Sequence, residues 1–183
     1  ACAPGRYGFG QQHNANYCSD CPSGEYQPAF GQDVCIACLE GRFGAGEQTS
    51  ANYCKQCEKG TYQSFTSKTA CVACARGRFG HGDQTLMSYC KDCAAGSVAA
   101  AEKALKCTNC LVPTEFVATA GMHTCDATTS CTADQYQTTE PTTSSNRQCQ
   151  PLTVCQPGEY ESVAPTLTLD RQCETGEATC PEG

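Results

Sequence analysis

The chain has 183 residues, a formal net charge of −7 and 19 cysteines, but Leu, Ile, Val and Phe together fill only 21 positions. So few core-forming residues exclude an ordinary globular domain, because burial of apolar surface could not offset the conformational entropy lost on folding. The acidic balance disfavours nucleic acid and anionic membranes as partners, and the sequence contains no apolar run of 18 residues that would span a membrane. The cysteine content instead predicts a disulfide-stapled protein of an oxidising compartment, extracellular or at the cell surface.

The cysteines follow a regular ladder from the start of the chain. From Cys2 to Cys110 the intervals alternate between 14 or 16 residues and three residues. The sequence between them also repeats, because Gly-Arg-aromatic-Gly stretches begin at Gly5, Gly41 and Gly77, 36 residues apart. A fixed period of this size is typical of tandem arrays in which small units stack on their neighbours.

This spacing predicts both the domain organisation and the fold class. Three repeats of two loops cover residues 2–37, 38–73 and 74–109, an irregular loop covers 110–130, and two repeats with a 24-residue period cover 131–154 and 155–179. Residues 180–183 copy the opening of a repeat, so we expect the chain to be a segment of a longer secreted or membrane-anchored protein. The expected fold is an elongated rod of about nine tandem cysteine-closed loops, with short β-ribbons and little helix.

The disulfide pairing is predicted from the alternation of long and short intervals. Joining each opening cysteine to the next closing one uses 18 cysteines: Cys2–Cys18, Cys21–Cys35, Cys38–Cys54, Cys57–Cys71, Cys74–Cys90, Cys93–Cys107, Cys110–Cys125, Cys131–Cys149 and Cys155–Cys173. Cys180 is left unpaired, as an opener without a closing partner within the sequence. Spacing does not prove connectivity, so an interleaved pairing such as Cys18–Cys35 with Cys21–Cys38 stays open.

Zinc and redox chemistry are the two alternative uses of these cysteines. Cys18/Cys21 with Cys35/Cys38 have the spacing of a zinc ribbon. Each C-x2-C pair would, however, have to choose between two neighbours, and the pairs end at Cys110 while the repeats continue. A thioredoxin-like role needs one C-x2-C at the start of a helix, and none is distinguished from its copies. We therefore predict no metal and no cofactor.

Further positions recur behind the opening cysteines. A glycine is expected to supply a turn with positive φ; it stands at Gly5, Gly24, Gly41, Gly60, Gly77, Gly96 and Gly158. An aromatic residue is expected to pack on each disulfide, or alternatively to stay exposed for ligand stacking; it stands at Tyr7, Tyr26, Phe43, Tyr62, Phe79, Tyr136 and Tyr160. Recurrent arginines (Arg6, Arg42 and Arg78) are expected either to stack on an aromatic ring or to be solvated. Residues 97–106 are rich in helix formers, so a helix is expected there.

The repeat resembles known extracellular modules. C-x2-G-x-[Tyr/Phe]…C-x2-C, best seen from Cys21 to Cys38, resembles the cysteine-rich repeats of ephrin receptors and the opening submodule of tumour necrosis factor receptor repeats. The block from Cys149 to Cys173 resembles receptor-type repeats of large surface proteins of protists and algae. The resemblance covers essentially the whole chain and implies a disulfide-rich ectodomain, stalk or matrix component. The chain lacks the extra cysteine pair that interlocks the second submodule of receptor repeats.

The sequence predicts a non-catalytic function. His13, His81 and His123 stand at inconsistent repeat positions, and no motif of paired acids or of nucleophile and base is present. We expect a structural segment of a secreted or cell-surface protein, part of a filament, surface appendage or adhesive or matrix assembly, whose partners are other copies or other subunits. The alternative is a ligand-binding receptor ectodomain, for which Leu111-Val112-Pro113 with Phe116, or Leu86-Met87, would form the apolar contact.

Threonine-rich stretches near prolines are candidate sites for O-linked glycans, which would make the protein a glycoprotein. The candidates are Thr138, Thr139, Thr142, Thr143, Thr166 and Thr168.

Overall fold

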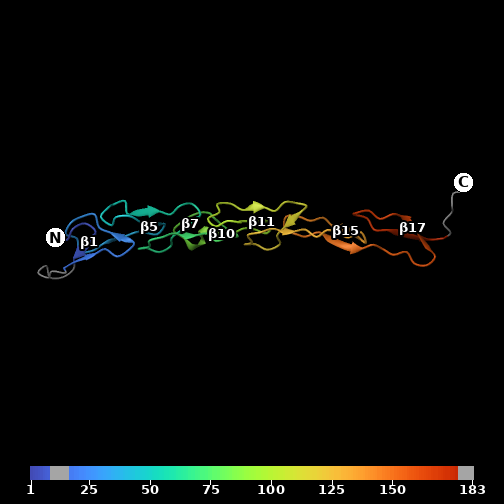
Figure 1. The fold of residues 1–183 in the computed structure, drawn as a ribbon, viewed down its shortest axis with the longest axis horizontal. Coiled ribbons are helices and arrows are strands. Elements are labelled where there is room, and N and C mark those ends of the chain that lie inside the picture. Colours follow the sequence, from blue (N-terminus) through green and yellow to red (C-terminus); the bar gives the residue numbers. More distant parts are fainter. Residues whose placement is uncertain (9–16, 177–183) are drawn as a thin grey trace. The chain divides into compact units, whose positions relative to one another are not determined.

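The computed structural model describes residues 1–8 and 17–176 of the chain (Figure 1). The regular structure in them consists of nine two-stranded ribbons and one three-residue 3-10 helix, η1 (Met87–Tyr89). The ribbons are β1 (Arg6–Gly8) with β2 (Cys18–Asp20), β3 (Glu25–Tyr26) with β4 (Ile36–Ala37), β5 (Arg42–Gly44) with β6 (Cys54–Gln56), β7 (Thr61–Tyr62) with β8 (Val72–Ala73), β9 (Arg78–Gly80) with β10 (Cys90–Asp92), β11 (Ser97–Val98) with β12 (Thr108–Asn109), β13 (Glu115–Phe116) with β14 (Asp126–Ala127), β15 (Gln135–Thr139) with β16 (Gln148–Pro151) and β17 (Glu159–Val163) with β18 (Gln172–Thr175). Tandem loops with short β-ribbons and almost no helix are thereby confirmed.

A disulfide closes each of nine successive loops, which we number 1 to 9 in chain order. The bonded pairs are Cys2–Cys18, Cys21–Cys35, Cys38–Cys54, Cys57–Cys71, Cys74–Cys90, Cys93–Cys107, Cys110–Cys125, Cys131–Cys149 and Cys155–Cys173. Each opening cysteine is thus joined to the next closing one, rather than across loops as in the interleaved alternative. Cys180 and the repeat opening expected at residues 180–183 lie outside the described residues.

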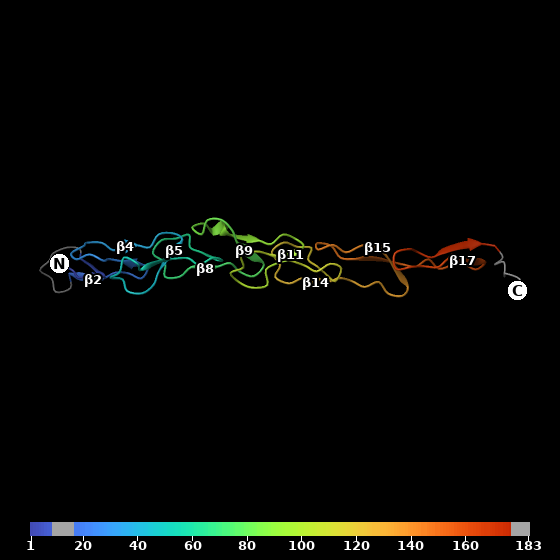
Figure 2. The same cartoon turned by 90° about the horizontal axis from the view of Figure 1, so that it is seen from above.

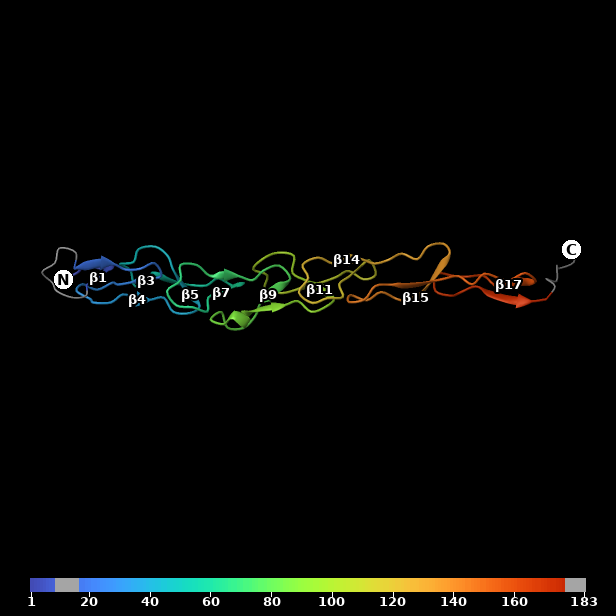
Figure 3. The ribbon, with the colours of Figure 1, turned by 90° about the horizontal axis from the view of Figure 1, so that it is seen from below.

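The chain divides into two compact units. The first comprises Ala1–Cys93, Ala99–Thr108 and Gly121–His123, and the second comprises Ala94–Val98, Asn109–Ala120 and Thr124–Gly183. Loops 1 to 5 lie wholly in the first unit, and their ribbons succeed one another in chain order when seen from above in Figure 2 and from below in Figure 3. Each of these loops therefore has its sequence neighbours as its spatial neighbours, as in other repeat arrays. The repeat boundaries stated above stay a prediction.

Sulfur replaces the apolar core. The opening cysteines of loops 1 to 7 are all at most 6% exposed: Cys2, Cys21, Cys38, Cys57, Cys74, Cys93 and Cys110. Cys74 and Cys90 form a buried cluster with Tyr89, against which Tyr62 packs. In a closed loop of this size each disulfide stabilises the fold by about 3 kcal/mol, mainly by restricting the unfolded chain.

Backbone hydrogen bonds join successive loops of the first unit. The glycine N–H groups of Gly8, Gly44 and Gly80 donate to the carbonyl oxygens of Gln32, Lys68 and Ala104, at 3.0, 2.7 and 2.8 Å. These donors occupy equivalent positions in loops 1, 3 and 5, and the acceptors lie in loops 2, 4 and 6. The backbone groups that a short ribbon leaves unpaired are in this way satisfied by the next loop.

The first unit also contains contacts between loops that are two apart. The turn glycines after the opening cysteines have positive φ, as predicted, and at Gly24 (φ 87°) this turn lies directly against the backbone of Ser67, in loop 4. The Ser67 hydroxyl donates to the Glu25 carboxylate at 3.0 Å. Gly60 lies in the same way against the backbone of Lys103, in loop 6. A loop is therefore held by the two loops that follow it.

The helix predicted over residues 97–106 is wrong. Residues 97–98 form strand β11, and Lys103 adopts a left-handed conformation (φ 59°) that interrupts a right-handed helix. The backbone N–H of Lys103 donates to the Cys74 carbonyl oxygen at 2.9 Å, and the Ala104 carbonyl accepts from Gly80. Helix propensity is a weak preference, and docking on loop 5 overrides it.

Candidate functional site: repeated junctions and surface grooves

The described residues hold no cluster of three His, Cys, Asp or Glu side chains that could bind a metal ion. The four cysteines with zinc-ribbon spacing take part in three separate disulfides. Cys21 is bonded to Cys35, whereas Cys18 is bonded to Cys2 and Cys38 to Cys54. Among the helices described, none is long and apolar enough to cross a membrane.

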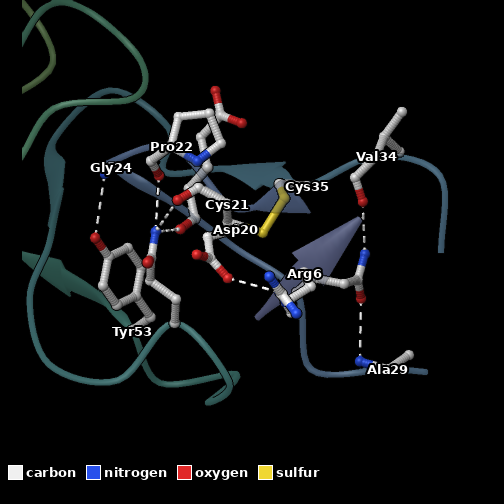
Figure 4. Close-up of a disulfide and its surroundings, with 12 residues drawn as sticks. Arg6, Asp20, Cys21, Pro22, Gly24, Ala29, Val34, Cys35 and Tyr53 are labelled. Carbon is white, nitrogen blue, oxygen red and sulfur yellow. Dashed lines mark hydrogen bonds and ion pairs between the residues drawn. A yellow bond between two sulfur atoms is a disulfide. The ribbon is translucent and has the colours of Figure 1, made fainter. Parts of the chain in front are cut away.

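Two buried tyrosines bridge an even-numbered loop to the next odd-numbered one. The hydroxyl oxygens of Tyr53 and Tyr89 accept hydrogen bonds from the backbone N–H groups of Gly24 and Gly60, at 3.1 and 3.0 Å, and Figure 4 shows the first of these bonds. Both tyrosines are only 5% exposed. The Tyr53 ring lies 6.1 Å from the ring of Tyr26. Each hydroxyl thus provides a hydrogen-bond acceptor for the backbone N–H of the turn glycine in the preceding loop.

Two glutamines support the same junctions. The Gln48 side-chain amide donates to the carbonyl oxygens of Cys21, Pro22 and Glu25 at 2.9, 2.8 and 2.7 Å. Gln84, 36 residues later, makes the equivalent bonds to loop 4 at 3.2, 2.7 and 2.8 Å. One amide therefore fastens the opening turn of the preceding loop.

Sequence reasoning missed these tyrosines and glutamines, although a signal was present. Tyr17, Tyr53 and Tyr89 recur every 36 residues, as do Gln48 and Gln84. The aromatic residues singled out instead, at Tyr7, Tyr26, Phe43, Tyr62, Phe79 and Tyr136, are half-buried, and Tyr160 is exposed. Tyr62 packs against the buried cluster of Tyr89 with the bonded Cys74 and Cys90, and for the other residues packing on a disulfide stays a prediction.

Removing a junction hydroxyl should destabilise the protein measurably. Tyr89→Phe leaves the Gly60 N–H, in a buried residue, without its acceptor, so we expect the free energy of unfolding to fall by about 1–3 kcal/mol. The matched control is Tyr136→Phe, whose hydroxyl makes only an exposed bond to Gln150, so a change within about 0.5 kcal/mol is expected. Urea denaturation with the disulfides intact measures both, and equal losses would contradict the assigned role of Tyr89.

The recurrent arginines lie across their own ribbons rather than over aromatic rings. Arg6 pairs with Asp20 at 2.7 Å and Arg78 with Asp92 at 2.8 Å, in each case directly across the ribbon. Arg42, where Gln56 replaces the acid, donates instead to the Cys54 carbonyl oxygen at 3.1 Å. These exposed ion pairs contribute little to stability. They leave guanidinium groups on the surface at regular intervals.

Two surface grooves of the first unit have equivalent linings. The first encloses about 470 Å³ and is lined by Pro4, Gly5, Arg6, Asp20, Gly46, Glu47, Gln48 and Thr49. The second encloses about 280 Å³ and is lined by the residues 36 positions later: Glu40, Gly41, Arg42, Gln56, Gly82, Asp83, Gln84 and Thr85. Each groove therefore presents one arginine, one junction glutamine and acidic side chains. We call them groove 1 and groove 2.

The acidic side of groove 2 is fixed by a local turn. The backbone N–H of Thr85 donates to the Asp83 carboxylate at 2.9 Å. This hydrogen bond, together with that of the Thr85 side chain, lowers the pKa of Asp83. The carboxylate therefore stays negatively charged in mildly acidic solution.

The apolar residues proposed for receptor binding are exposed but not distinctive. Leu111 and Met87 are 67% and 63% exposed. Phe30 and Leu167, in other loops, are more exposed still, at 71% and 82%. Exposed apolar side chains are thus distributed over many loops, and among the residues that the structure describes no single loop is distinguished as an apolar ligand site.

The candidate glycan acceptors differ in their availability. The Thr142 and Thr166 hydroxyl oxygens are used in local turns, and the Thr138 hydroxyl bonds to the Gln148 carbonyl oxygen. Thr143 is half-buried against Gly96. The remaining two candidates, Thr139 and Thr168, are exposed.

Comparison with known protein families identifies one stretch of the chain. The family described as tyrosine-protein kinase ephrin type A/B receptor-like matches residues 8–52, which extend from loop 1 into loop 3. No curated protein matches the sequence. The disulfides and this extracellular type of domain suggest an extracellular location. The chain is therefore an array of disulfide-closed cysteine-rich repeats, in which residues 8–52 are similar to ephrin-receptor-like repeats.

Proposed function

We propose that the chain is a non-catalytic structural segment of a secreted or cell-surface protein, which contacts neighbouring chains of an extracellular assembly through grooves 1 and 2. The observation that carries the proposal is the equivalence of the two grooves, residue for residue, at a spacing of 36. A contact repeated along an array gains strength from each copy, even where a single contact is weak. Filaments, surface appendages and adhesive matrices all use this principle.

The polar lining of the grooves suits an assembly contact of this kind. Each groove combines a guanidinium group with carboxylates, for example Arg6 and Glu47 in groove 1. Such mixed charges define the register of two chains and disfavour wrong partners more than they add affinity. The junction glutamines, which line the grooves, are in turn hydrogen-bonded to the backbone of the preceding loop.

Charge reversal in the grooves tests the proposal. Glu47→Lys and Asp83→Lys should each weaken assembly. The double variant should lower the affinity by the product of the two single factors, because the free energies of the contacts add along the array. The matched controls Glu102→Lys and Asp33→Lys make the same changes at exposed positions of the same unit that line neither groove.

Electron microscopy and sedimentation of the native protein provide the measurement. Fibres or oligomers that the controls form and the double groove variant does not would support the proposal. Discrete particles in all cases, which take up a soluble partner, would contradict it and favour the receptor alternative.

We also propose that the protein carries O-linked glycans, on Thr139 and Thr168. Their exposure and the nearby Pro141 and Pro165 support this choice over the four threonines whose hydroxyls or surroundings are occupied. Mass spectrometry of peptides from the secreted protein would contradict it if both threonines were unmodified.

A further inference from the structure

A hollow around Tyr89 departs from the repeat. It encloses about 310 Å³ within the first unit and is lined by Lys59, Gly80, His81, Gly82, Gln84, Tyr89 and Leu105. Thirty-six residues earlier the same positions hold Ser23, Gly44, Ala45, Gly46, Gln48, Tyr53 and Thr69. The residues that form the junction are therefore the same in both repeats, whereas the lip of the hollow has changed at three positions.

The three changes replace small side chains by two basic ones and one apolar one. Lys59 replaces a serine, His81 replaces an alanine and Leu105 replaces a threonine. Two groups able to donate hydrogen bonds and to carry positive charge thus replace small neutral side chains, beside one apolar edge. In a chain of net charge −7 such a pair without an acidic lining residue is unusual. Residues that only maintain the fold would be expected to repeat.

His81 and Tyr89 are held in place by the junction. The His81 backbone N–H donates to the Tyr89 carbonyl oxygen at 2.8 Å, and the imidazole ring lies 6.1 Å from the Phe79 ring. The Tyr89 hydroxyl accepts from Gly60, so its own proton stays available for an acceptor in the hollow. The neighbouring carboxylate of Glu58 lines a different cavity, where it approaches Lys103 at 4.0 Å.

We propose that this hollow binds an anionic group, a carboxylate, sulfate or phosphate, through Lys59, His81 and the Tyr89 hydroxyl. Hydrogen bonds to a charged acceptor are stronger than neutral ones, and three donors around one hollow suit the several oxygens of such a group. The hollow shares Gly82 and Gln84 with groove 2, but Lys59, His81 and Tyr89 line neither groove, and the proposal does not depend on the proposed assembly.

The repeat itself supplies the variants for a test. Lys59→Ser and His81→Ala restore the side chains that the preceding repeat carries, so both proteins are expected to fold. In the reverse direction, Ser23→Lys with Ala45→His transfers the two basic groups to the equivalent positions near Tyr53. The control Lys91→Ser removes an exposed lysine of strand β10 that does not line the hollow.

Nuclear magnetic resonance titrations with sodium sulfate, phosphate and acetate, at fixed pH and ionic strength against chloride, measure binding on the single chain. We expect saturable shifts at His81 and Lys59, about tenfold weaker affinity in each single variant, unchanged affinity in Lys91→Ser, and a second site of similar affinity in the transfer variant. A preference for sulfate or phosphate over acetate distinguishes a tetrahedral anion from a carboxylate. Shifts that do not saturate, or that persist in the Lys59→Ser/His81→Ala double variant, would overturn the proposal.

Discussion

Gly24→Ala is expected to cost about 3–5 kcal/mol of the free energy of unfolding, far more than an alanine in an ordinary exposed turn. The left-handed conformation alone penalises a side chain by about 1–2 kcal/mol. In addition, the new methyl group would overlap the carbonyl group of Ser67, so loop 4 would have to move away from loop 2. That movement would disturb the hydrogen bond from the Ser67 N–H to the Cys38 carbonyl oxygen.

The control for this prediction is Gly46→Ala. Gly46 also has positive φ (97°), but an added methyl group would meet no atom within 4 Å. We therefore expect a loss of only about 1–2 kcal/mol. Urea denaturation of the two variants separates the cost of the backbone conformation from the cost of the contact between loops. Equal losses in the free energy of unfolding would show that loops 2 and 4 are not in tight steric contact at Gly24.

Removing an inner disulfide should destabilise the protein more than removing the last one. The double variant Cys74→Ala/Cys90→Ala loses a closed loop, worth about 3 kcal/mol, and also empties part of the buried cluster with Tyr89, so we expect about 5 kcal/mol in all. Cys155→Ala/Cys173→Ala opens a loop of similar length, but both cysteines are half-buried, so about 3 kcal/mol is expected.

Paired substitution avoids free thiols, and denaturant unfolding combined with limited proteolysis gives the readout. The proteolysis pattern should widen from loop 5 to its neighbours in the first variant and stay confined to loop 9 in the second. If both double variants lost the same free energy of unfolding, burial of the sulfur atoms would add nothing to the stabilisation that comes from loop closure.

The repeat pattern predicted what is local to one loop. The opening glycines, such as Gly24, lie in left-handed turns because only the identity of one residue and its distance from a cysteine are involved. Cys21 is bonded to Cys35 within the same loop, so the interval between them was informative. The short ribbons follow from the same closure.

What the pattern could not predict depends on other loops. Residues 97–106 favour a helix by composition, but Lys103 donates to loop 5 and takes up a left-handed conformation there. The roles of Tyr53 and Gln48 require knowing which loop faces which, although both residues recur. Grooves 1 and 2 have the same origin, since each is lined by residues of two odd-numbered loops and by one residue of the segment that follows the first of them. The residues that make such contacts recur periodically in the sequence, but the period does not show which loop they contact.

The alternation of two kinds of junction restricts how such a molecule can change its length. The turn glycine Gly24 meets a tyrosine hydroxyl, whereas Gly41 donates to the Gln63 carbonyl oxygen. Deleting or duplicating one loop would bring two surfaces of the same kind together and leave a glycine N–H without its acceptor. Within loops 1 to 5, insertion or loss of 36 residues keeps each surface opposite its complement, so we expect gene segments that encode this part of the array to grow and shrink in steps of two loops.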